Sequence, residues 1–157
     1  MSYTRYLTAE LLIRKHILMD LFVEMASEED DDMDSLVNEP RIAAFLNLTQ
    51  RSGVHAKVIM DAWDLARERF GDTLQDCQEE MRVSGIPTNI PARDFSRHFE
   101  CEERGAELSG VWVGWTYWRG GGKHGNPEAI PWIEQAYLLD VTEEERVVTV
   151  RTFRIKE

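Results

Sequence analysis

The segment GIPTNIPARD, residues 85–94, divides the chain into two parts with different sequence patterns. Its two prolines and its glycine disfavour both a helix interior and a central strand, so it is typical of a connector. Before it, apolar residues recur at the three- and four-residue spacing of amphipathic helices. After it, β-branched and aromatic residues alternate with charged ones, as they do in strands. We therefore expect helices and strands to form separate blocks of one fold.

The part before the connector predicts about four helices. Thr8 is suited to cap the first helix, which carries two adjacent apolar stripes. A helix that is apolar on two sides is either central to the fold or part of a subunit contact, and we expect the central position. Pro40 fits the first turn of a second helix. A third helix is expected over residues 54–70 and a fourth over residues 72–83.

The part after the connector predicts four strands, at residues 96–108, 110–120, 133–141 and 146–156. Short connections between successive strands favour an antiparallel meander. The expected fold class is α+β, with an N-terminal helical half packed on a C-terminal four-stranded antiparallel meander. We expect a single domain over residues 1–157, made of a helical half (1–85), a connector (86–95) and a β half (96–157).

The charge of the chain is strongly negative. It has 29 acidic and 18 basic residues among 157, a net charge of −11, of which residues 1–85 contribute −8. Such a surface repels nucleic acid and attracts basic partners, including proteins that themselves bind nucleic acid. The alternative is that the acidity only keeps the protein soluble.

The densest acidic run is SEEDDDMD, residues 27–34. Six like charges in eight residues favour a solvated loop. The more specific hypothesis is that these carboxylates mimic the phosphates of a nucleic acid and bind a basic groove of a partner. The candidate partner-binding residues here are Glu28, Glu29, Asp30, Asp31, Asp32 and Asp34. The fourth predicted helix extends the acidic surface with Asp72, Asp76, Glu79 and Glu80.

The strand-like segment GVWVGWTYWRG, residues 110–120, holds three of the five tryptophans. Alternate residues of a strand point to opposite faces, so Trp115 lies on one face and Trp112 and Trp118 lie on the other. Helices cover only one face. Trp112 and Trp118 either pack on cross-strand neighbours or form an aromatic patch that anchors a partner, since tryptophan is frequent at interface hot spots.

The glycine-rich segment RGGGKHG, residues 119–125, has two interpretations. One is a hairpin loop whose backbone needs positive φ, and the other is a nest of free N–H groups that contacts an anion or a partner. A nucleotide-binding loop is disfavoured because no Ser or Thr follows the lysine. Arg119, Lys123 and His124 join the candidate partner-binding residues.

The sequence carries no motif for catalysis or metal binding. The four histidines are scattered, and neither H-E-x-x-H nor paired C-x-x-C occurs. Cys77 and Cys101 each lie among acidic residues, which raises the pKa of a thiol and disfavours a thiolate. We therefore predict a protein that is not an enzyme and has no metal and no cofactor.

The chain has neither an apolar run of about 18 residues nor the pattern of a secretory signal. Its two cysteines form no paired motif. These features predict a soluble cytoplasmic protein that binds neither a membrane nor nucleic acid directly.

The segment GWTYWRGGGKHGNPEAIPWIEQAYLLDVTEEERVVTVRTF, residues 114–153, resembles the C-terminal part of proteins carried on phages, plasmids and genomic islands of Gram-negative bacteria. That resemblance implies origin on a mobile element and brings no activity with it. In size and acidity the chain is also similar to phage-encoded anti-CRISPR proteins, a likeness that implies an inhibitor.

Three functional hypotheses follow. The first is a non-enzymatic acidic binding protein, an inhibitor of a host defence complex that binds nucleic acid. The second is a structural subunit or homodimer that uses the first helix or the last strand. The third is a small enzyme, or a binder of anions or nucleotides, that uses the glycine-rich loop.

Overall fold

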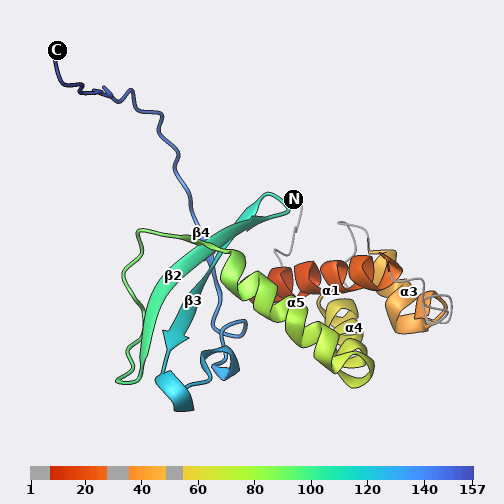
Figure 1. Cartoon of the computed structure of the whole chain (residues 1–157). Helices are drawn as coiled ribbons and strands as arrows, with labels where there is room; N and C mark the ends of the chain where they lie inside the picture. The colour runs from red at the N-terminus through yellow and green to blue at the C-terminus, as the bar shows by residue number, and fades with distance from the viewer. Residues whose placement is uncertain (1–7, 28–35, 49–54) are drawn as a thin grey trace.

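A computed structural model describes residues 8–27, 36–48 and 55–157, apart from the side chains of His55 and His124. Helices lie on one side and a sheet on the other (Figure 1). The helices of the described part are α1 (Ala9–Ser27), α3 (Pro40–Leu46), α4 (His55–Arg69) and α5 (Gly71–Ser84). The strands are β1 (Ile86–Pro87), β2 (Phe99–Leu108), β3 (Val111–Gly120) and β4 (Tyr137–Leu139), with short 3₁₀ turns η1 (Gly122–His124) and η2 (Pro127–Ala129) before β4.

The sheet is a four-stranded antiparallel meander in the order β1-β2-β3-β4. Its backbone is the β2–β3 hairpin, ten residues on each side, which turns at Ser109 and Gly110, both at positive φ. The short strand β4 pairs with β3 only over Trp112–Gly114. The α+β fold class and the antiparallel meander are thus confirmed.

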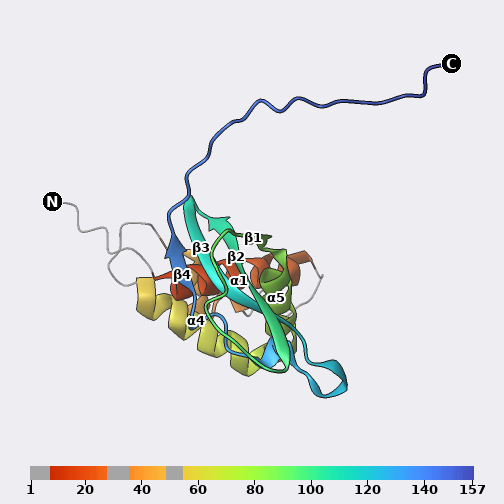
Figure 2. The same ribbon diagram turned by 90° about the vertical axis from the view of Figure 1, so that its left-hand side faces the viewer.

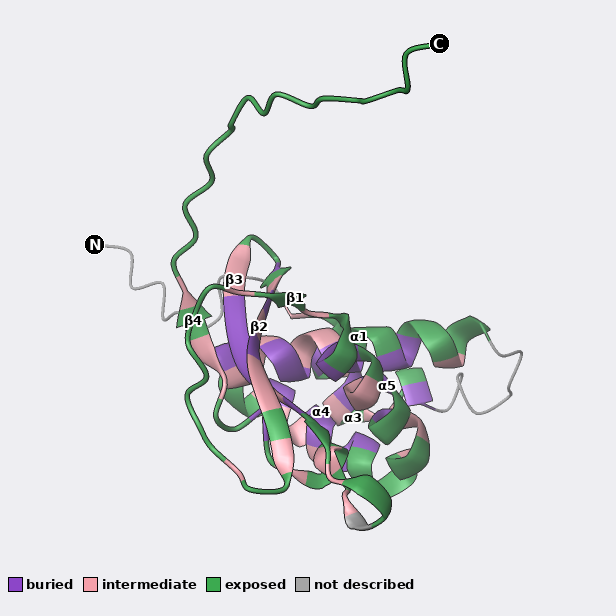
Figure 3. Ribbon diagram, turned by 60° about the vertical axis from the view of Figure 1, so that its left-hand side comes forward, coloured by how far each residue is buried: buried purple, intermediate pink, exposed green. Residues whose placement is uncertain are grey.

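Two of the four strands differ from those expected. The first strand, β1, comes from the connector, and residues 146–156 form no strand although their composition predicted one. Leu139 pairs with Trp112, one residue from the start of β3, and no turn after it returns the chain to the sheet. The chain therefore passes the end of the sheet at residues 140–141. Residues 140–157 then run away from the body and are exposed throughout (Figure 3).

The helix α1 lies at the centre of the core, as its two apolar stripes predicted. Ile13, Ile17 and Leu21 are fully buried, and α1 packs against α4, α5 and the sheet. From the sheet side, the fully buried Trp115 completes the core; its indole N–H donates to the carbonyl of Arg82 in α5 at 3.1 Å. Burial of such large apolar side chains is the main stabilising contribution to a fold of this size.

The connector covers the other face of the sheet. Residues 88–98 run across that face (Figure 2), where the backbone N–H of Thr88 donates to the carbonyl of Glu103 at 3.0 Å. Further along, the guanidinium of Arg93 lies 4.2 Å from the ring centre of Tyr137. The face that helices do not cover is therefore shielded from water by the same segment that separates the two halves of the sequence.

A close approach of two strands makes Gly114 irreplaceable. A Cβ atom at this position would lie 2.5 Å from the ring of Tyr137, its cross-strand partner. The ring also contacts the guanidinium of Arg93, and its hydroxyl donates a hydrogen bond to Glu103. Moving the ring away from residue 114 would disturb both contacts.

The substitution Gly114→Ala should lower the free energy of unfolding by about 1–3 kcal/mol, because the added methyl overpacks this contact. The matched control is Gly71→Ala, since a Cβ atom there meets nothing within 4 Å. This control should leave stability unchanged or raise it by up to about 1 kcal/mol. Urea unfolding followed by tryptophan fluorescence measures both, and equal stability of the two variants would contradict the packing described.

Candidate partner-binding surface

One side of α5 presents a row of carboxylates to solvent. Asp72, Asp76 and Glu80 are spaced four residues apart and are all exposed. The opposite side carries the buried Leu74 and Cys77 and packs on α1. Because residues four apart lie on the same side of a helix, burying the apolar stripe directs the three carboxylates outward together.

A second helix adds to this row. The thiol of Cys77 donates to the carboxylate of Glu24 in α1 at 3.4 Å. Burial, followed by this hydrogen bond and by the charges of Glu24, Glu80 and Asp20, raises the pKa of Cys77 to about 12. Carboxylates of α1 (Asp20 and Glu24) and of α5 (Glu80) therefore act together on the thiol of Cys77.

We give the name acidic face to five exposed carboxylates of the packed helices α1 and α5: Asp20, Glu24, Asp72, Asp76 and Glu80. Among the described residues, the only basic side chain within ion-pair distance of its members is His16, whose Nε2 lies 3.4 Å from Asp20. The other four carboxylates form no ion pair within the described ranges. The negative charge of the acidic face is thus left largely uncompensated by the protein itself.

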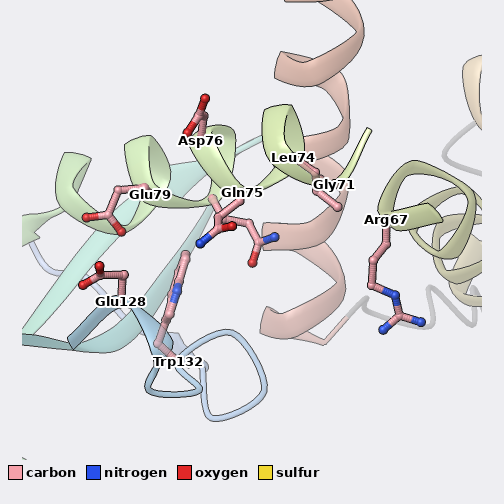
Figure 4. A pocket seen from close by; sticks show the side chains of 9 residues that line it. Arg67, Gly71, Leu74, Gln75, Asp76, Glu79, Glu128 and Trp132 are labelled. Carbon is pink, nitrogen blue, oxygen red and sulfur yellow. The ribbon is translucent and has the colours of Figure 1, made fainter. Parts of the chain in front are cut away.

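A polar groove of about 550 Å³ borders the acidic face (Figure 4). It runs between α5 and the segment around η2, and Leu74 and Trp132 form part of its wall. Glu79 and Glu128 point toward one another at one end, and Arg67 lies at the other. The guanidinium of Arg82, which binds Glu79 at 2.7 Å, partly compensates the negative end. Both carboxylate oxygens of Glu79 accept hydrogen bonds from Arg82, each at 2.7 Å, whereas Glu128 is exposed.

The two aromatic candidates, Trp112 and Trp118, are more buried than residues of an exposed binding patch would be. Trp118 is only 5% exposed and packs edge-on against Phe99, and its indole N–H has no acceptor among the described residues. Trp112 is half-buried opposite Glu107 and Leu139. Of the two, only Trp112 offers surface to a partner in this structure.

The remaining candidates are dispersed. Arg119 is exposed, but its guanidinium binds Glu100 on β2 at 3.1 Å, and Lys123 is exposed in η1. The side chain of His124 lies outside the described residues, as does the whole acidic run Glu28, Glu29, Asp30, Asp31, Asp32 and Asp34. The described members of this set, Arg119 and Lys123, are not part of the acidic face.

The glycine-rich loop packs on itself. Gly120, Gly121 and Gly122 have φ angles of 88°, 90° and 61°, a region that favours glycine. A Cβ atom on Gly121 would lie 2.5 Å from the ring of Phe99, and one on Gly125 would clash with Gly121. Backbone conformation and close approach account for the glycines here, as the loop interpretation requires.

A buried polar cluster on the covered face of the sheet was not expected from the sequence. The carboxylate of Glu103 is 2% exposed and accepts hydrogen bonds from the hydroxyls of Thr116 and Tyr137, each at 2.9 Å. Burial and the neighbouring Glu103 raise the pKa of Tyr137. The cluster ties β2, β3 and β4 together beneath the connector, and we assign it a structural role.

Sequence reasoning also missed Asp20, Glu24 and Glu128. Asp20 and Glu24 are four residues apart on one predicted helix, which is a signal for a shared face. Nothing in the sequence brings that face beside the fourth helix, because only the packing of α1 on α5 does so.

No protein-family model, curated protein or solved structure matches the chain. Within the described ranges, every helix is too short or too polar to cross a bilayer. Nor do three or more His, Cys, Asp or Glu side chains of these residues converge in a way suited to a metal ion.

The raised pKa of Cys77 predicts a specific dependence of stability on pH. The folded protein holds the thiol proton more tightly than the unfolded chain, whose cysteine has the ordinary pKa of 9.0. The free energy of unfolding should therefore be fully supported below about pH 9 and fall as the pH rises toward 12. In Cys77→Ala this fall should be shallower.

Urea unfolding of both proteins between neutral and alkaline pH measures the difference. Iodoacetamide labelling of a Cys101→Ser background gives a second readout, and Cys77 should react slowly until the protein unfolds. Parallel pH profiles together with rapid labelling of the folded protein would contradict this assignment.

Proposed function

We propose that this protein is a non-enzymatic binding protein that docks through its acidic face onto a basic surface of another protein. The observation that carries the proposal is the set of five exposed carboxylates on the packed helices α1 and α5, of which, among the described residues, only Asp20 has a basic side chain, His16, within ion-pair distance. Charge of one sign concentrated on one side steers association with a partner of the opposite sign.

The partner that fits this surface best is a protein that binds nucleic acid. Carboxylates four residues apart along α5 repeat about every 6 Å, so they offer a basic groove a series of negative charges, as a nucleic acid backbone does. Together with the resemblance to mobile-element proteins, this supports an inhibitor of a host defence complex that binds nucleic acid, in the manner of an anti-CRISPR protein. Inhibition would follow from occupying the groove that the nucleic acid uses.

The groove beside the acidic face provides a specific anchor. Glu79 and Glu128 flank one end of it, so a lysine or arginine of the partner that enters there meets two carboxylates. Charge-assisted hydrogen bonds of this kind are stronger than those between neutral groups and fix orientation. The acidic face thus supplies long-range attraction, and the groove supplies local recognition.

The test begins with capture of a partner from a bacterial lysate on the immobilised chain, followed by identification of that partner by mass spectrometry. The dissociation constant of the purified partner is then measured for the triple variant Asp72→Asn, Asp76→Asn and Glu80→Gln. Loss of three steering charges should weaken binding by about tenfold or more. Raising the salt concentration from about 0.05 to about 0.5 M should weaken binding of the unmodified protein as well.

The matched control is the triple variant Glu143→Gln, Glu144→Gln and Glu145→Gln, which removes the same charge from a segment away from the acidic face. The control should bind as the unmodified protein does. A short DNA or RNA duplex should compete with the chain for the partner. Equal weakening by the two variants, or a partner that holds nucleic acid and this protein at once, would contradict the proposal.

A further inference from the structure

The C-terminal segment of the described chain has the composition of a strand but pairs with no sheet. Residues 140–157 are exposed along their whole length and run away from the body (Figures 1 and 2). Five large apolar side chains of this segment are each at least 74% exposed: Val147, Val148, Val150, Phe153 and Ile155. They occupy both alternating faces of an extended chain, as in a strand that is covered on both sides.

The sheet has an open edge at β4. This strand pairs with β3 on one side only, and it is the last strand of the sheet. Leu138 and the following Val141 are about half exposed there. The opposite edge is less suited to pairing, because β1 contains Pro87, which lacks an N–H group. An additional strand is therefore accommodated best beside β4.

The charge of the segment differs from that of the body. Residues 146–157 carry four basic side chains and one acidic, a net charge of +3, which leaves −14 on the rest of the −11 chain. Two such segments repel each other, whereas each is attracted to the acidic body of another copy. Asp140 directly follows β4, whereas Glu134, which precedes β4, already binds Arg14 at 3.2 Å. Charge complementarity thus identifies a second copy of this chain as the partner.

We propose that residues 146–156 add as a strand to the β4 edge of a second copy, and that the second copy returns its own segment in the same way. The result is a two-fold symmetric dimer by strand exchange, in which each sheet gains a fifth, antiparallel strand. Residues 140–145 form the hinge; fully extended, these six residues span about 20 Å, which is enough to reach a neighbouring sheet. This dimer does not depend on the acidic face.

The structure shows the hinge in its open form. A turn at residues 142–145 would instead return the strand to the β4 edge of its own chain. Exchange replaces that turn by an extended hinge and keeps the same strand pairing, so the two forms differ mainly in which copy supplies the strand. A subunit of a strand-exchanged dimer, taken by itself, has an extended hinge and a sheet edge without a paired strand, as this chain does.

The test is the mass of the full chain in solution, measured by light scattering and by sedimentation over a range of concentrations. The unmodified chain should be a dimer at micromolar concentration. Val150→Pro removes a ladder hydrogen bond and should raise the dissociation constant of the dimer about tenfold or more. Val150→Thr keeps both the N–H group and the β-branch, so it is the matched control and should remain dimeric.

A charge variant tests whether attraction between the basic segment and the acidic body stabilises the dimer. Arg151→Glu combined with Arg154→Glu should weaken the dimer further, because it places acidic side chains against an acidic body. Every residue of the segment is exposed, so these variants should keep the tryptophan fluorescence and melting temperature of the body. Amide hydrogen exchange of residues 146–156 completes the experiment, and these amides should be protected in the dimer.

Each alternative has its own result, and each overturns the proposal. A monomer with protected amides at residues 146–156 means that the strand folds back on its own chain. A monomer with unprotected amides means that the segment is free or awaits a different protein. A dimer that persists in Val150→Pro means that another surface, such as α1, makes the contact.

Discussion

The contacts of Arg82 with β3 determine how the helical half meets the sheet. Its carbonyl accepts the indole N–H of Trp115, and its buried guanidinium donates to the carbonyl of Trp118 at 2.7 Å and lies over the ring of Tyr117. Hydrogen bonds from its guanidinium to Glu79 raise the pKa of Arg82, so this buried cation stays charged. One residue at the end of α5 therefore fixes the rotation of that helix against the sheet.

That rotation decides which side of α5 faces solvent. With Leu74 and Cys77 packed on α1, the carboxylates of α5 turn outward beside those of α1. The cost of bringing like charges together is small at an exposed surface, because water and salt screen them. In the proposed function, these charges would act when a basic partner replaces the water, and they contribute little to the stability of the fold itself.

The molecule also separates its charges along the chain. The body is acidic, and the last twelve residues are basic and rich in β-branched side chains. A strand of this kind is stable only when its backbone and its apolar side chains find partners. In this structure the segment runs beyond the end of β3 and pairs with no strand of its own sheet.

The sequence by itself determined the elements and their class. Periodic apolar residues predicted the helices, including the central position of α1, and the alternation over residues 99–120 predicted the long hairpin, because these patterns follow from local geometry. Only the tertiary structure decided which tryptophans are buried, that the connector supplies β1 and covers the sheet, that residues 146–156 stay unpaired, and that Glu24 lies beside Cys77. Each of these features depends on contacts between residues that are distant in the chain. A local sequence pattern specifies which face of a helix or strand a residue occupies, but it does not specify which residues pack against that face.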